Sequence, residues 1–169
     1  MTSRETHATR IATSLRAAID EGVAIFRGVS EERTARRTAP DQWCAREVIG
    51  HLIDSACNNH RRFIINQDAD RLILDPYQQD IWVARQRYAD TPVSELVPTW
   101  AAYNRHIARV IEAMPDEVLN CGRGPIGHFS FPYSGMPQSD AVTLRHLVED
   151  YVGHIRHHFK QIRSILETG

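Results

Sequence analysis

Apolar residues recur every three or four positions in four long stretches of this 169-residue chain. That spacing places the apolar side chains on one face of an α-helix. The four stretches cover about residues 11–28, 44–68, 96–115 and 140–166. Pro40 and Asp41 are typical start signals for the second helix, and Pro115 is expected to end the third. The chain is therefore predicted to be all-α.

Four amphipathic helices joined by irregular links are typical of a four-helix bundle. The sequence DPYQQDIWVARQRYAD (75–90) predicts a loop and a short extra helix between the second and third long helices. Residues 120–140 are rich in Gly, Pro and Ser, which predicts a long connection with a small amount of extended structure before the last helix. These two long connections permit a crossover topology. The length suits one domain spanning residues 1–169.

The charge balance excludes whole classes of partner. Twenty Lys and Arg residues stand against 21 Asp and Glu residues, so no net positive field draws the protein to nucleic acid or to an anionic membrane. No stretch is long and apolar enough to span a bilayer, and the first residues do not read as a secretion signal. The three cysteines lack the spacing of a zinc knuckle or redox pair. We expect a cytoplasmic protein.

Histidines interrupt the apolar seam of the last helix. His154 and His158 are four residues apart and in phase with its apolar positions, whereas His146 and His157 share a polar strip predicted to face water or another subunit. One reading makes His154 and His158 core-edge residues bonded to neighbours. The other is a divalent metal, which satisfies both imidazoles at once. In the second helix His51 lies beside the apolar stripe and offers a third ligand, in the manner of metal sites inside bundles.

Three blocks of the chain resemble those of a known family. They are DQWCAREVIGHLIDSACNNHRRF (41–63), DPYQQDIWV (75–83) and YVGHIRHHFKQI (151–162). They look like the signature blocks of the DinB-like superfamily, in its YfiT-like branch of metal-dependent hydrolases and bacillithiol S-transferases. The resemblance implies a four-helix bundle whose metal is held by His51, His154 and His158, the same three residues that the facing argument selects. It also makes a homodimer a reasonable expectation.

Three neutral imidazoles with an open position suit zinc or nickel first, and also iron or copper. A cation with no anionic ligand deprotonates a thiol readily. The first hypothesis is therefore a transferase that activates a low-molecular-weight thiol, such as bacillithiol, mycothiol or glutathione, against an electrophilic substrate. The alternative is a hydrolase in which the metal activates water. A third hypothesis is a metal-stabilised binding or stress-response module without catalysis.

Other polar residues have weaker assignments. Asp54 is expected to orient His51, to make a polar contact between helices, or to act as a general base. Asp150 is a second candidate base, although its strip predicts solvation. Arg61 and Arg62 are candidates to bind a carboxylate of a thiol cofactor or substrate, against the simpler reading of a solvated helix end. Further candidates for the same cleft are Asp80, Trp82, Tyr77, Asn58 and Tyr103.

Overall fold

The structure is a computed structural model that describes residues 5–123, 131–133 and 142–168. Its helices are α1 (His7–Ile25), α2 (Glu31–Ala35), α3 (Ala45–Ile65), α4 (Gln79–Gln86), α5 (Val93–Glu112), α6 (Asp116–Asn120) and α7 (Leu144–Thr168), with a 3-10 turn η1 (Tyr88–Asp90). In the described part of the chain, the one extended pairing is an isolated bridge between Gly122 and Thr143. The predicted all-α bundle, with its short extra helix at α4, is confirmed. No helix among the described residues is long and apolar enough to cross a membrane.

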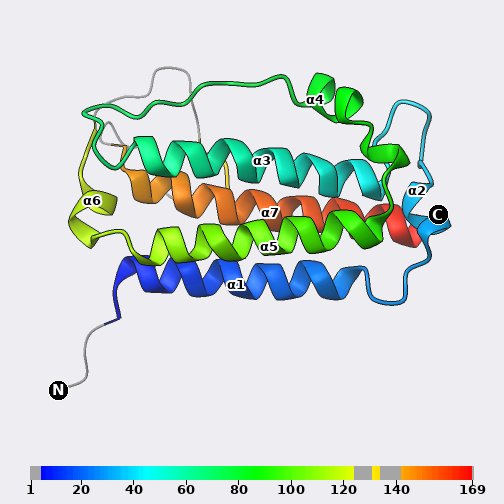
Figure 1. Cartoon of the computed structure of the whole chain (residues 1–169), viewed down its shortest axis with the longest axis horizontal. Coiled ribbons are helices and arrows are strands. Elements are labelled where there is room, and N and C mark those ends of the chain that lie inside the picture. The colour runs from blue at the N-terminus through cyan, green and yellow to red at the C-terminus, as the bar shows by residue number, and fades with distance from the viewer. Residues whose placement is uncertain (1–4, 124–130, 134–141, 169) are drawn as a thin grey trace.

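The four long helices form the bundle, and their order around it differs from their order along the chain. Helix α1 packs against α5 and α7, and α3 packs against the same two helices, so α1 and α3 are diagonal neighbours. Figure 1 shows that α1 and α7 run in one direction and that α3 and α5 run in the other. Helices α3 and α5, which are consecutive among the four long helices, are thus parallel. The crossover topology that the long connections permit is the one adopted.

Parallel α3 and α5 require the chain to return the length of the bundle between them. Residues 66–78 make that return along the outside of α3 and lead into α4 (Figure 1). Asn66, at the end of α3, fixes the start of the return, because its side chain accepts from the Ile73 N–H at 2.6 Å and donates to the Ile73 carbonyl at 3.0 Å. The connection is therefore held against the helix that carries His51.

Close packing between helices depends on one glycine in α1. A Cβ atom on Gly22 would lie 2.6 Å from the Phe159 ring and 2.7 Å from the Trp100 ring. Those two rings are fully buried and meet edge to face with centroids 5.6 Å apart. The apolar faces of α1, α5 and α7 thus meet in the core, as the periodicity predicts.

One predicted helix start is confirmed and another is wrong by a few residues. Helix α3 begins at Ala45, directly after residues 38–43 as predicted, because Cys44 occupies the N-cap position and donates its N–H to Glu47 Oε2 at 2.9 Å. Helix α7 was expected from about residue 140, which lies outside the described residues, but it begins at Leu144. Thr143 still takes part in the bridge to Gly122. The short helices α2 and α6 were not predicted.

Candidate metal centre

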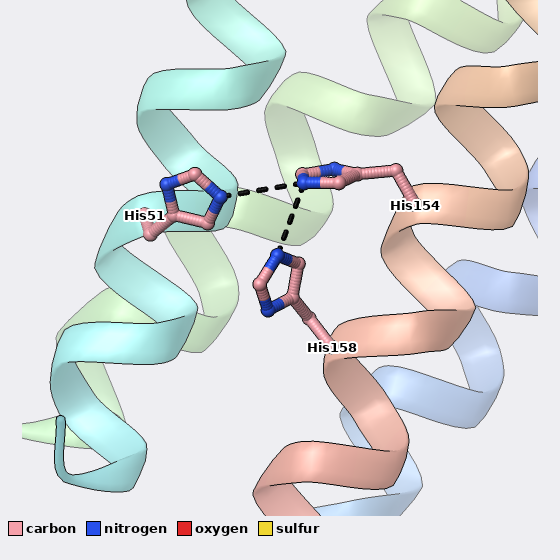
Figure 2. Close-up of side chains that lie close together, drawn as sticks. All are labelled: His51, His154 and His158. Carbon is pink, nitrogen blue, oxygen red and sulfur yellow. Dashed lines mark hydrogen bonds between the residues drawn. The ribbon is translucent and has the colours of Figure 1, made fainter. Parts of the chain in front are cut away.

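Three histidines from two antiparallel helices converge at the seam between α3 and α7. His51 lies on α3, and His154 and His158 lie one turn apart on α7, with their rings directed toward one another (Figure 2). The Nε2 atom of His154 is 3.4 Å from His51 Nε2 and 3.0 Å from His158 Nε2. One nitrogen from each ring lies within 4.8 Å of the other two. The predicted inward facing of all three residues is confirmed.

Two of the three opposite ring nitrogens have a polar neighbour. His158 Nδ1 is 2.8 Å from Gln161 Oε1. Because an amide oxygen can only accept a hydrogen bond, the hydrogen of this ring is on Nδ1. His154 Nδ1 lies 3.4 Å from Ser55 Oγ. His51 is 2 % exposed and its Nδ1 is buried without a partner. With its Nδ1 protonated, His158 presents the lone pair of Nε2 to the centre of the cluster.

Aromatic rings fix the orientation of His51 from both sides. The Trp43 ring centroid is 5.2 Å from that of His51 at a tilt of 40°, and the Tyr77 ring is stacked at 6.5 Å. Tyr77 comes from the return connection and contacts Trp82 of α4 at 5.0 Å. The crossover therefore places an aromatic cover beside the cluster.

All three imidazoles are neutral at pH 7. Burial, and to a smaller extent nearby His158, lower the pKa of His51 to about 3. Burial and the neighbouring histidines lower the pKa of His154 to about 2. Burial also lowers the pKa of His158, against the raising effect of the hydrogen bond to Gln161. The neutral form is the one that binds metal.

This donor set fits a divalent ion. Around an ion with metal–nitrogen distances of about 2.0–2.1 Å, neighbouring ligand nitrogens lie roughly 3.0–3.4 Å apart, the range of the two measured Nε2 separations. Hydrogen bonds alone do not satisfy the three converging Nε2 atoms. If His154 Nε2 forms a hydrogen bond with one of the other two histidines, the Nε2 atom of the remaining histidine still faces it without a partner. The three-histidine group can hold a metal ion, which removes that conflict.

Two cavities meet at the cluster and share His154 and Gln79 in their walls. The wider one, about 730 Å³, is open, and it also contacts His158, Gln161 and Lys160. The narrower one, about 190 Å³, runs along α3 beneath Tyr77. A ligand can therefore approach the Nε2 atoms from either side.

Asp54 does not contact His51 by any hydrogen bond among the described residues. Its Oδ1 accepts from the Tyr88 hydroxyl at 2.8 Å and from Gln86 Nε2 at 2.5 Å, and its Oδ2 is buried without a partner. Burial raises the pKa of Asp54, against those two hydrogen bonds. Of the roles expected for Asp54, the structure shows the polar contact, which joins helix α3 to the α4–η1 segment.

The adjacent arginines point to different places. Arg61 is exposed and pairs with Asp75 Oδ2 at 2.8 Å, outside both cavities. Arg62 is 8 % exposed and lines the narrower cavity together with His51 and His154. The expected solvated helix end is thus found for Arg61, whereas Arg62 is buried.

The polar strip on α7 is less solvated than expected. Asp150 is half-buried in the wall of the narrower cavity, and its Oδ1 accepts the Tyr133 N–H at 2.6 Å. His146 is half-buried too, stacked on Phe131 with centroids 6.5 Å apart. Segment 131–133 contacts both residues, so each is partly rather than fully exposed. His157 is exposed, as predicted.

Of the remaining cleft candidates, Tyr77 and Asp80 line the cavities. Tyr103 lies elsewhere, bonded to His60 at 2.9 Å, and Asn58 donates to the Asp54 carbonyl. Cavity residues that the sequence did not single out are Trp43, Ser55, Asn59 and Gln79. Ser55 and Asn59 follow His51 at one and two helical turns, so their spacing was an available signal.

The fold and the cluster together define a four-helix bundle with a candidate three-histidine metal centre. The family model of the DinB superfamily matches residues 14–162, and the chain belongs to that superfamily. Among solved structures it is similar to YfiT from Bacillus subtilis, described as a probable metal-dependent hydrolase with an unusual four-helix bundle topology. The TM-score is 0.75 at 17 % identity, over 98 % of this chain and 89 % of that one. The curated proteins include no match.

The comparisons establish the family and the fold. The single-domain organisation and the homodimer stay predictions, as do the thiol, the metal's identity and the individual residue roles.

Proposed function

We propose that this protein is a metal-dependent hydrolase of small substrates, with one divalent ion held by His51, His154 and His158. The convergence of three Nε2 atoms where two cavities meet carries the proposal. Zinc or nickel is the expected ion, because both accept three imidazoles and leave positions open. When bound, such an ion supplies a Lewis acid that polarises a carbonyl and acidifies water. The description of the similar YfiT structure supports this reading.

The side chains around the histidines have separate tasks in this proposal. Gln161 and Ser55 hold the Nδ1 atoms, which keeps Nε2 of His158 and His154 directed at the ion. Asp150 stands in the cavity wall one turn before His154, where its carboxylate can accept the proton that attacking water loses. Asp54 instead fixes the α4–η1 segment through Tyr88 and Gln86.

Thiol transfer is the second candidate. It is favoured by the wider cavity, whose volume of about 730 Å³ accommodates a thiol of tripeptide size beside His154 and His158. Lys160 and Gln161 in its wall offer polar contacts to such a molecule. This reaction needs no general base, because the ion itself favours the thiolate.

The test starts with metal analysis of protein purified without chelators, beside His154→Ala. We expect about one divalent ion per chain in the wild type and none in the variant. The loaded protein is then assayed with a panel of small esters and amides, and separately with bacillithiol, mycothiol or glutathione plus an electrophile. Metal-dependent ester or amide cleavage supports the hydrolase, and thiol-dependent turnover alone supports the transferase. Stoichiometric metal with no turnover favours the binding module, and no metal uptake refutes all three metal-based readings.

A further inference from the structure

A stripe of buried polar residues runs along one face of α3. His51, Ser55, Asn59 and Arg62 follow one another at intervals of four, four and three residues, which places them on the same side of the helix. Their exposed fractions are 2 %, 3 %, 8 % and 8 %. All four line the narrower cavity of about 190 Å³. The cavity therefore joins the histidine cluster to a buried guanidinium.

The charge of Arg62 has no carboxylate partner. Its Nη2 donates to the Asp75 carbonyl and its Nη1 lies 3.5 Å from Asn59 Oδ1, and both acceptors are neutral. Among the described residues, no carboxylate oxygen lies within 4.0 Å of Arg62, whereas neighbouring Arg61 takes the carboxylate of Asp75. The charge of Asp75 acts on Arg62 only from beyond direct contact and is already paired with Arg61, and a buried cation without a direct ion pair is costly. The guanidinium also has five N–H donors, more than these contacts use.

The rest of the cavity suits a small molecule with one anionic end. Phe131, Leu147 and Tyr151 supply apolar or aromatic wall, and Tyr77 covers it from the return connection. The other charged wall residue, Asp150, stands one turn from His154, on the side of the histidines, and would repel an anion placed there. In the metal-free protein an anionic group is therefore favoured at Arg62 and not beside the histidines.

The helix sets the shape of the occupant. Eleven residues separate His51 from Arg62, which corresponds to roughly 16 Å of helix before the two side chains shorten the gap. A cavity of about 190 Å³ is smaller than most drug-sized sites. A slender molecule that reaches both ends fits this space better than a compact one.

From this arrangement we infer that Arg62 binds the carboxylate of the substrate, which is a small elongated acid with its reacting group at the opposite end, beside the histidines. The position of the reacting group beside the histidines rests on the proposed function, whereas the binding of a carboxylate by Arg62 does not. Planar bidentate pairing makes Arg the residue best suited to a carboxylate.

A purely structural role for Arg62 makes a different prediction. Its bond to the Asp75 carbonyl anchors the return connection, and Asn66 anchors the same connection through Ile73. Asn66 does not line the cavity. Asn66→Ala is therefore the matched control, because it loosens the connection without removing the charge from the cavity.

The first measurement needs no metal. Metal-free protein is titrated with hexanoate and with hexanamide, and the Arg62 Nε–H resonance is followed by NMR. We expect a saturable shift with hexanoate, absent with hexanamide, that persists in Asn66→Ala. Equal responses to the two probes, or none to either, would overturn the inference. Because this arm uses wild-type protein, it stands even if Arg62→Gln folds poorly.

The second measurement uses metal-loaded protein and two hydroxamates of equal length, adipic acid monohydroxamate and its carboxamide analogue. The acid should bind at least about tenfold more tightly. Arg62→Gln should abolish that preference and Asn66→Ala should keep it. Equal affinities in the wild type contradict the inference. If neither hydroxamate distinguishes loaded from metal-free protein, the proposed function fails while the hexanoate result still decides the role of Arg62.

Discussion

The Tyr88 hydroxyl donates a 2.8 Å hydrogen bond to Asp54 Oδ1 across 34 residues of chain. The contact joins η1 to the helix that carries His51, and it depends on Gly50, where a Cβ atom would lie 2.1 Å from the Tyr88 ring. Tyr88 and Asp54 are both buried. The pair holds η1 against α3, and neither residue makes a hydrogen bond to the histidine cluster.

Replacing Tyr88 by Phe should therefore reduce stability and spare metal binding. The change leaves the buried carboxylate of Asp54 with one donor, Gln86, and we expect the free energy of unfolding to fall by about 1–3 kcal/mol. Urea denaturation measures the loss, and metal titration of the folded variant should give the wild-type stoichiometry. Loss of the metal in this variant would show that Asp54 acts on His51 after all.

The three clustered histidines should be individually necessary for stoichiometric metal binding. His51→Ala and His158→Ala each remove one of the converging Nε2 atoms, whereas His157→Ala removes an exposed ring whose centroid is 5.3 Å from that of His158. Elemental analysis after dialysis should find the metal in His157→Ala only. Equal loss in all three variants would contradict the assigned ligand set.

Gln161 should tune the metal affinity through His158. Gln161→Leu removes the acceptor that holds Nδ1 and orients the ring, and we expect metal binding to weaken about 10-fold to 100-fold. Competition with a chromogenic chelator measures the change. Ser164→Leu, one turn further along α7 at an exposed position, is the control and should bind metal as the wild type does. An unchanged affinity in Gln161→Leu would mean that packing alone orients His158.

Acid should destabilise the metal-free protein. In the unfolded chain His51 and His154 take up protons near pH 6.5, whereas burial keeps their pKa values at about 3 and about 2 in the folded state. The unfolded state therefore binds more protons between these limits, so the free energy of unfolding falls as the pH drops below about 6.5. The slope is at most about 1.4 kcal/mol per pH unit for each histidine.

Urea midpoints at pH 7 and pH 5 measure this effect, and His51→Gln should flatten the dependence. Asp54 works in the opposite direction, because burial raises its pKa and the folded state then holds the extra proton. A wild-type stability that rises on acidification would show that the histidines do not dominate.

The facing of the histidines was predictable because it depends only on helical spacing. His154 and His158 continue the seam of Leu147 and Tyr151, and His51 lies beside the stripe of its own helix, so two periodicities determined the cluster. The same rule separates Arg62 from Arg61, since only Arg62 falls in phase with His51, Ser55 and Asn59.

Contacts between distant segments were not predictable in this way. Nothing near Asp54 in the sequence marks Tyr88 or Gln86 as its partners, because the return of the chain along α3 brings them there. The start of α3 was predictable for a local reason. Pro40 and Asp41 mark the approach to the helix, and the bond from Cys44 N–H to Glu47 sets the boundary.

Because α3 and α5 are parallel, the metal ligands and the residues that cover them come from different parts of the chain. The metal ligands are supplied by α3 and α7, whereas Tyr77 and Gln79 above them come from the return connection and the start of α4. Loops tolerate sequence change better than packed helices do. A new substrate preference can thus arise by exchanging residues 67–79 as a cassette, while the histidines and the core that positions them stay unaltered.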